Sequence, residues 1–205
     1  MADRYVNGIN VTALGQYAEE IQAKPEIRTF TFRARNRWGG GAYSASTIQD
    51  FAIGNREDTS RPAPFVIEAG EPFALLGENE GPNATEAALH ALATCVGTTL
   101  IYHAAAHGVE IEELEVDIEG DLDIRGFVGV TDEVRRGYRQ VRITFRVSAD
   151  APEEKIREVC TMGQRYSPVF DIVTNRVPVQ TMVEINRSGA RSDVTYQQDQ
   201  RREAA

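Results

Sequence analysis

The chain has 205 residues, of which 41% are hydrophobic and 26% charged, with 31 Asp and Glu against 22 Lys and Arg. The formal net charge of -9 argues against a nucleic-acid or anionic-membrane partner, because phosphate binding needs a surplus of cations on some face. Two cysteines are too few for a disulfide scaffold, and three histidines leave little room for a histidine-rich metal site. We expect a cytoplasmic globular protein with one α+β domain.

Neither a targeting segment nor a membrane span is expected. The first ten residues include Asp3 and Arg4 and contain no apolar run, unlike a signal peptide. The segment 87–109 has no Asp, Glu, Lys or Arg, but it is poor in the Leu, Ile and Phe that drive insertion. We therefore predict a buried core helix there.

The N-terminal third predicts one helix followed by strands. Leu14, Tyr17, Ala18 and Ile21 have helical spacing, and Pro25 disfavours helix in the residue before it. Strict alternation then predicts a strand with Phe30, Phe32 and Ala34 on its buried face. The predicted elements are a helix over 11–24, strands over 29–38, 42–53 and 65–68, a glycine turn at 39–41 and a polar loop over 54–61.

The longest predicted element is a helix that starts after Asn83 and ends at His107. Asn83 is a good N-cap, Glu86 completes a capping-box pattern, and Gly108 supplies the C-terminal stop. Such a helix is about 35 Å long, so we expect sheets to wrap around it.

The C-terminal half predicts two antiparallel strands around 114–118 and 141–147, then two helices and a last strand. Asp150 is the expected cap of a helix ending near Arg165, Ser167 caps another, and Val177–Ile185 forms the closing strand. The expected organisation is an N-terminal helical extension (1–28), a main domain (29–187) and a disordered tail (188–205).

Several common site motifs are absent: the sequence has no phosphate-binding loop, no G-x-S-x-G elbow and no C-x-x-C. His103 and His107 are four residues apart and could share a helix face as metal ligands, but the H-E-x-x-H pattern is not met. We therefore expect neither a metal nor another cofactor.

Cys95 is the side chain most capable of a chemical reaction in this sequence. It shares a helical stripe with Ala88, Leu92, Thr99 and Tyr102, and most free cysteines in such positions are small buried hydrophobes. A reactive role requires a cation near the sulfur to stabilise the thiolate.

The segment Gly81–Cys95 resembles the signature of the OsmC/Ohr family, in which a G-[TP]-N-P-E-type loop opens a central helix and the reactive cysteine lies fourteen residues after the first glycine. Ser167-Pro-Val resembles the second family signature, Cys-Pro-Val or Cys-Pro-Tyr. The resemblance extends over roughly Phe30–Ile185. It implies an α+β fold with antiparallel sheets around a long central helix, and a homodimer with its site at the subunit interface.

The resemblance further implies a thiol peroxidase for organic hydroperoxides. Cys95 would attack the peroxide as thiolate, and an arginine held by a glutamate would activate it. The glutamate position is Thr85 here, with Glu86 adjacent. The arginine position falls near Trp38, which leaves Arg37 and Arg35, and strand alternation is expected to favour one of them.

The second cysteine is missing, because Ser167 occupies its position and an alcohol cannot form the disulfide. Cys160, seven residues earlier, is either a displaced resolving thiol or a core residue, and the distance that a disulfide permits argues for the core role. We expect an external thiol as resolving partner. The alternative is a non-catalytic dimer that binds an apolar small molecule in the family's active-site cleft.

Overall fold

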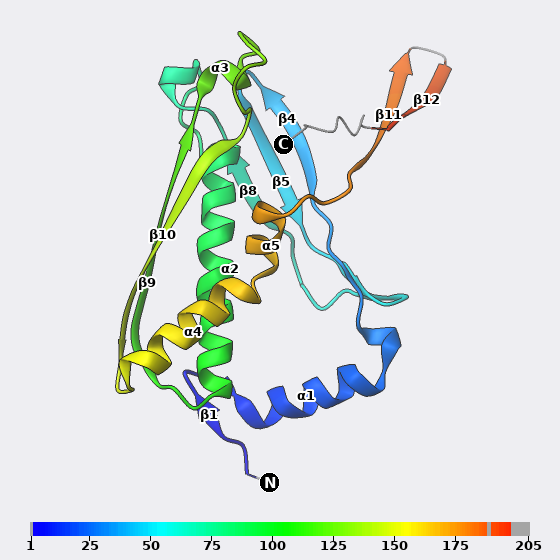
Figure 1. The fold of residues 1–205 in the computed structure, drawn as a ribbon. Coiled ribbons are helices and arrows are strands. Elements are labelled where there is room, and N and C mark those ends of the chain that lie inside the picture. The colour runs from blue at the N-terminus through cyan, green and yellow to red at the C-terminus, as the bar shows by residue number, and fades with distance from the viewer. Residues whose placement is uncertain (1, 188–189, 198–205) are drawn as a thin grey trace. The chain divides into compact units, whose positions relative to one another are not determined.

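The computed structural model describes residues 2–187 and 190–197, and its side chains as far as Ile185 (Figure 1). It divides into two compact units, Met1–Phe170 and Asp171–Ala205. The described part combines helices with antiparallel sheets, which confirms the predicted α+β class.

Residues 5–27 form a hairpin, a helix and a short 3₁₀ turn. β1 (Tyr5–Val6) pairs with β2 (Ile9–Asn10), and α1 (Val11–Ala23) follows, as predicted, before the short 3₁₀ turn η1 (Pro25–Ile27). The Asn10 side chain accepts a hydrogen bond from the backbone N–H of Ala13 at 3.0 Å and so caps α1. The Asn7 side chain bonds to Val109 O at 2.9 Å and to Ile111 N at 2.8 Å, which fixes the hairpin to the unit's core.

Two small antiparallel sheets follow. β3 (Phe30–Thr31), β6 (Phe51–Ile53) and β7 (Arg56–Asp58) form one, and β4 (Arg35–Gly40), β5 (Tyr43–Ile48) and β8 (Phe65–Ala69) form the other. The single strands predicted over 29–38 and 42–53 are therefore wrong, because each is divided where the chain passes from one sheet to the other. The loop predicted over 54–61 is also wrong in part. Gly54, at φ 56°, and Asn55 form a two-residue hairpin loop, and β7 begins directly after it.

The sheet β4–β5–β8 has apolar side chains exposed on both faces. Neighbouring residues of a strand point to opposite faces, yet Phe65 and Val66 of β8 are each 60% exposed. Trp38 and Phe32, predicted to belong to a strand with one buried side, are 72% and 67% exposed. The predicted buried face of this region is thus uncovered in the single chain.

The predicted long helix is α2 (Ala84–Ala106), which follows the 3₁₀ turn η2 (Phe73–Leu75). Asn83 and Glu86 form the predicted capping box, and Gly108, at φ 69°, follows the helix end as expected. Of the described residues, only this helix is long and apolar enough to cross a membrane, a property that core helices share. Its buried residues are Leu92, Val96, Gly97, Leu100, Ala104 and Ala105.

The core of the first unit lies where β9 (Ile111–Leu122), β10 (Tyr138–Ala149) and α4 (Glu153–Arg165) meet α2 (Figure 1). The short helix α3 (Ile124–Phe127) lies in the connection between the two strands. β9 and β10 pair antiparallel, as predicted, with Ile118 opposite Ile143. The predicted cap Asp150 is wrong: Pro152 is the cap residue of α4, without a side-chain hydrogen bond. The buried cluster consists of Leu100, Ala104, Val109 and Val159.

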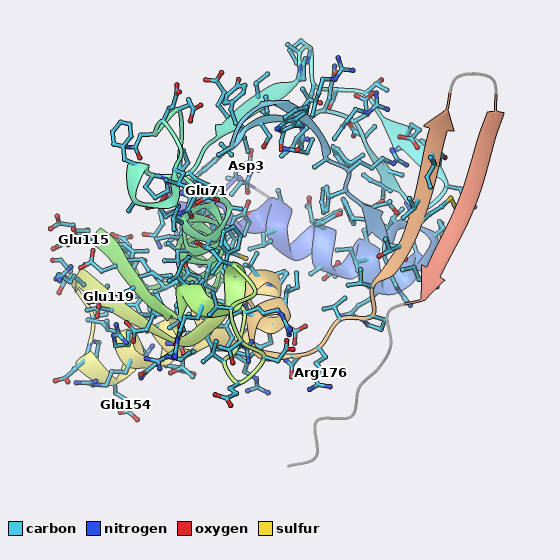
Figure 2. The ribbon with its side chains drawn as sticks, turned by 90° about the horizontal axis from the view of Figure 1, so that it is seen from above. Asp3, Glu71, Glu115, Glu119, Glu154 and Arg176 are labelled. Atoms are coloured by element: carbon cyan, nitrogen blue, oxygen red, sulfur yellow. The ribbon has the colours of Figure 1, made fainter. Side chains whose placement is uncertain are left out.

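Much of the acidic charge lies on the outer face of β9. Arg142 pairs with Glu119 and Asp121, and Arg146 pairs with Glu115 and Asp117. Figure 2 shows Glu115 and Glu119 at the outer side of these strands. Exposed pairs of this kind add little stability, so this face is mainly a solvated surface.

The second unit contains most of α5 (Pro168–Thr174) and the hairpin of β11 (Gln180–Arg187) and β12 (Ala190–Gln197). The predicted closing strand begins three residues later than expected, after Pro178. The expectation of a disordered tail over 188–205 is wrong for Ala190–Gln197, which pair with β11. Residues 188, 189 and 198–205 lie outside the described residues.

Candidate functional site

Cys95 lies in the middle of α2 as a free, half-buried cysteine. Ala88, Ala91, Thr98 and Tyr102 share its side of the helix and are exposed, whereas the buried residues lie on the other sides. Leu92, which the predicted stripe included, is 2% exposed and faces the core. Cys95 thus lies on the uncovered side of α2, close to its border with the core.

The covered sides of α2 pack against β9 and α4. A Cβ at Gly97 would lie 3.5 Å from Cγ2 of Val116 in β9. A Cβ at Gly163 of α4 would lie only 2.9 Å from Cβ of Leu100. α4 therefore packs closely on α2 at Leu100, which by helical geometry lies on the side away from Cys95.

The Glu86 carboxylate takes part in the N-terminal cap of α2. Its Oε2 accepts a hydrogen bond from the backbone N–H of Asn83 at 2.9 Å. Nine residues separate it from Cys95, which is two and a half helical turns, or about 13 Å along the axis and on the opposite side. Within one chain, Glu86 therefore does not reach the Cys95 sulfur.

Thr85, at the family's glutamate position, also belongs to this helix start. Its hydroxyl donates to Asn83 Oδ1 at 2.8 Å, and its carbonyl accepts a hydrogen bond from the Tyr138 hydroxyl at 2.9 Å. This second bond ties the start of α2 to the first residue of β10.

Arg35 and Arg37 lie in β4 and are both exposed, opposite Thr47 and Ala45 of β5. The expectation that strand alternation separates the two is wrong. Residues two apart in a strand point to the same face, so strand alternation cannot distinguish Arg35 from Arg37.

Ser167 is 1% exposed and caps α5, as predicted. Its Oγ accepts a hydrogen bond from the backbone N–H of Phe170 at 3.1 Å. A buried hydroxyl with this partner is a structural cap at the position where the resemblance implies a second cysteine.

Cys160 packs against the buried cluster around Leu100 and Ala104. These two residues lie on the side of α2 opposite Cys95 by helical geometry. Burial also raises the pKa of the Cys160 thiol, which lowers its thiolate fraction at neutral pH. Its position favours the packing role over that of a displaced resolving thiol.

His103 and His107 come together at the end of α2, with ring centroids 6.4 Å apart. His103 also stacks on Tyr166 at 4.6 Å, and burial, followed by the nearby His107, lowers the pKa of His103. Across the described residues, no group of three or more His, Cys, Asp or Glu side chains could hold a metal ion.

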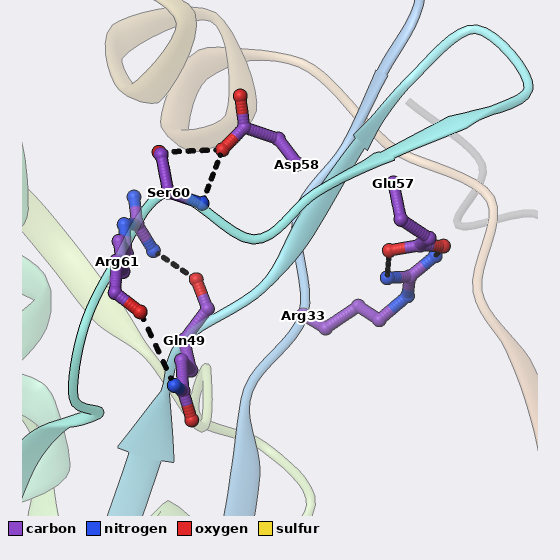
Figure 3. Close-up of polar contacts among 6 residues, drawn as sticks. All are labelled: Arg33, Gln49, Glu57, Asp58, Ser60 and Arg61. Carbon is purple, nitrogen blue, oxygen red and sulfur yellow. Dashed lines mark hydrogen bonds and ion pairs between the residues drawn. The ribbon is translucent and has the colours of Figure 1, made fainter.

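Arg61, which the sequence did not single out, lies against two aromatic rings. Its Cζ lies 5.1 Å from the ring centre of Phe51 and 5.4 Å from that of Phe65. Its Nη1 donates to Gln49 O at 2.7 Å, and Gln49 Nε2 donates back to Arg61 O at 3.3 Å (Figure 3). The sequence shows only a polar loop before Pro62, so this stacking is a product of tertiary structure.

These features define a class: an α+β protein with small antiparallel sheets and a long capped helix that carries a single thiol on its uncovered side. The family model of OsmC-like proteins matches residues 77–182, just over half of the chain. The chain belongs to the OsmC-like family.

Two solved structures agree with this fold. The chain is similar to the OsmC-like protein of Mycoplasma pneumoniae, with 15% identity, a TM-score of 0.55, and coverage of 71% of this chain and 89% of that one. It is also similar to a putative osmotic stress induced and detoxification response protein of Psychrobacter arcticus, with 14% identity, a TM-score of 0.50, and coverage of 68% and 85%. The organic hydroperoxide resistance protein OhrB of Bacillus subtilis matches with 21% identity, a TM-score of 0.42, and coverage of 71% and 92%. No curated protein matches the sequence.

Proposed function

We propose that the protein is a cysteine-dependent peroxidase that reduces organic hydroperoxides. The observation that carries this is the position of Cys95: a half-buried thiol on the uncovered side of the central helix, in the segment that matches the OsmC-like family. Ala88, Ala91 and Thr98 on the same side are small and exposed.

The reaction proceeds in three steps. The Cys95 thiolate attacks the peroxide oxygen and breaks the O–O bond, giving Cys95 sulfenic acid and, after protonation, the alcohol. An external thiol then condenses with the sulfenic acid, releasing water and forming a mixed disulfide. A second thiol attacks that disulfide, which restores Cys95 and leaves the reductant as its own disulfide.

The resolving thiol is external because neither internal candidate suits the role. Ser167 has no sulfur and is occupied as a helix cap. Cys160 packs on the opposite side of α2 from Cys95. The arginine that stabilises the thiolate is Arg35 or Arg37 by the family resemblance. Glu86, its resemblance-based partner, can act on Cys95 only from another chain.

We place this activity in a cytoplasmic homodimer that uses no cofactor. The exposed faces of β4–β5–β8 and the uncovered side of α2 support the dimer, because a three-stranded sheet needs a covered apolar face to be stable. An obligate dimer interface of this apolar kind commonly buries about 2,000 Å² or more.

The test is hydroperoxide consumption with a monothiol reductant. The wild-type protein should turn over cumene hydroperoxide, and Cys95→Ser should abolish turnover. Cys160→Ser is the matched control and should keep most of the activity. Unchanged turnover in Cys95→Ser would disprove the proposal.

A second function uses the same dimer without catalysis. Loss of the second cysteine and of the family's glutamate at Thr85 favours a protein that only binds an apolar small molecule. One equivalent of peroxide followed by mass spectrometry separates the two functions. A sulfenic acid on Cys95 supports the enzyme, whereas inert thiols and a co-purifying ligand support the binder.

A further inference from the structure

Two histidines come together at the end of α2, outside the site around Cys95. His103 and His107 are four residues apart, so their side chains lie on one face of the helix, with ring centroids 6.4 Å apart. His103 is half-buried and His107 is exposed. The pair therefore borders on solvent, and a dissolved ion can reach it.

The His107 ring has the tautomer of a metal ligand. Its Nδ1 lies 2.8 Å from the backbone oxygen of His103. A carbonyl oxygen can only accept a hydrogen bond, so Nδ1 carries the proton and the free lone pair of the neutral ring is on Nε2. Histidines that bind metals commonly donate their other N–H to a backbone carbonyl or a carboxylate in this way. His107 can therefore offer Nε2 to a metal without losing its hydrogen bond.

The His103 ring is oriented by stacking rather than by a hydrogen bond. It lies on the ring of Tyr166, with centroids 4.6 Å apart and an angle of 20° between the planes. Tyr166 directly follows α4, which packs against α2 (Figure 1). Within the described residues, the ring nitrogens of His103 have no hydrogen-bond partner in the protein. The ring thus keeps a defined orientation while its nitrogens stay available.

The separation of the two rings is close to what one shared ion requires. A metal–nitrogen distance of about 2.0–2.1 Å puts the centre of each ring about 3.2 Å from the ion. Two rings on one ion then lie about 5 Å apart at a tetrahedral angle and at most about 6.4 Å apart when they are opposite. The observed centroid distance of 6.4 Å is at the upper end of this range. A movement of about 1 Å by the exposed His107 ring gives the tetrahedral arrangement.

We propose that His103 and His107 together bind one divalent transition-metal ion, with water as the remaining ligands. Imidazole nitrogens suit Cu²⁺, Ni²⁺ and Zn²⁺, and the C-terminal end of a helix favours a cation. Arg165, whose Cζ lies 5.4 Å from the Tyr166 ring centre, opposes the charge of the ion, so binding should be weaker than at a site with three or four protein ligands. The expectation of no metal was based on the missing H-E-x-x-H pattern, whose glutamate is a catalytic base. This site needs no base, and the proposed chemistry at Cys95 does not use the ion.

The experiment is a calorimetric titration with Cu²⁺, Ni²⁺ and Zn²⁺ at pH 7.5. The full chain is purified without a polyhistidine tag and carries Cys95→Ser and Cys160→Ser, so that no thiol binds or reduces the metal. One ion should bind per chain, with Cu²⁺ bound most tightly. His103→Gln and His107→Gln should each weaken binding at least about tenfold, because even the loss of an outer-shell partner commonly costs that much. His90→Gln is the matched control, since it removes an exposed histidine of the same helix, and it should leave the affinity unchanged.

Two further readouts separate coordination from a structural effect of the substitutions. The electron paramagnetic resonance spectrum of bound Cu²⁺ should show two nitrogen ligands, and Zn²⁺ should raise Tm in the parent protein but not in His107→Gln, whose exposed side chain is not needed for folding. Undiminished binding in either histidine variant, or an equal loss in His90→Gln, would overturn the proposal. Binding that requires Cys95 or Cys160 would assign the metal to the thiols and overturn it as well. Peroxidase activity is a separate question, because Cys95→Ser tests it with different residues.

Discussion

Replacing Gly163 by alanine should destabilise the protein, although alanine is the better helix former. A Cβ at Gly163 would lie 2.9 Å from both Leu100 Cβ and Val96 O, and 3.3 Å from Leu100 Cα. Two of these atoms belong to the backbone of α2 and the third is attached to it, so the helices themselves must separate. Overpacking of this kind costs about 1–3 kcal/mol, which outweighs the gain of about 1 kcal/mol in helix propensity.

Gly97 of α2 provides the matched control. It is also a buried helical glycine, but a Cβ there would meet Val116 Cγ2 at 3.5 Å and Leu114 Cδ2 at 3.9 Å, which are ordinary contacts. Gly97→Ala should therefore be neutral or stabilise the fold by up to about 1 kcal/mol. The two substitutions share the same gain in helix propensity and differ mainly in the space available for the new methyl group.

Urea unfolding at one fixed protein concentration measures this contrast, since the stability of the proposed dimer would depend on concentration. The two variants should differ by about 2 kcal/mol, with unchanged m-values. Equal stabilisation by both alanines would show that α4 does not approach α2 as closely as described.

Three further predictions concern single side chains. Asn83→Ala removes the acceptor for the N–H of Glu86 and should cost about 1 kcal/mol in urea unfolding. Each variant with one remaining cysteine can be titrated with Ellman's reagent at pH 8. Cys160, in the Cys95→Ser variant, should react several-fold more slowly than Cys95, in the Cys160→Ser variant, because burial raises the pKa of the Cys160 thiol. Equal rates would contradict the packing position of Cys160. Because the pKa of His103 is lowered in the folded protein, the unfolded chain binds more protons than the folded one just below pH 6.5. The free energy of unfolding should therefore fall as the pH decreases from 7 to 5. His103→Gln should reduce that slope; a slope equal to that of the wild-type protein would refute the argument.

The predictions that the structure confirms depend on neighbours in sequence. The capping box of Asn83 and Glu86, the stop at Gly108 and the cap by Ser167 are hydrogen bonds or dihedral preferences within a few residues. The pairing of β9 with β10 followed from alternation that both strands show over many positions.

The predictions that failed depend on distant contacts. The strand predicted over 29–38 is divided because β3 and β4 have different partner strands, which alternation within one segment cannot reveal. β7 was missed because its three residues are polar and are defined by pairing across the turn at Gly54. Asp150 was a plausible cap by residue type, but the helix begins after Pro152.

By itself the sequence determined the α+β class, the long capped helix and the thiol at Cys95, because periodicity and capping are local properties. Only the tertiary structure decided which side of that helix is covered, that Cys160 packs away from the Cys95 side, and that Arg61 lies against the rings of Phe51 and Phe65. These are questions of which distant residues meet. The packing of α4 and β9 on α2 and the pairing of the sheets settle them, and neither follows from the spacing of residues along the chain.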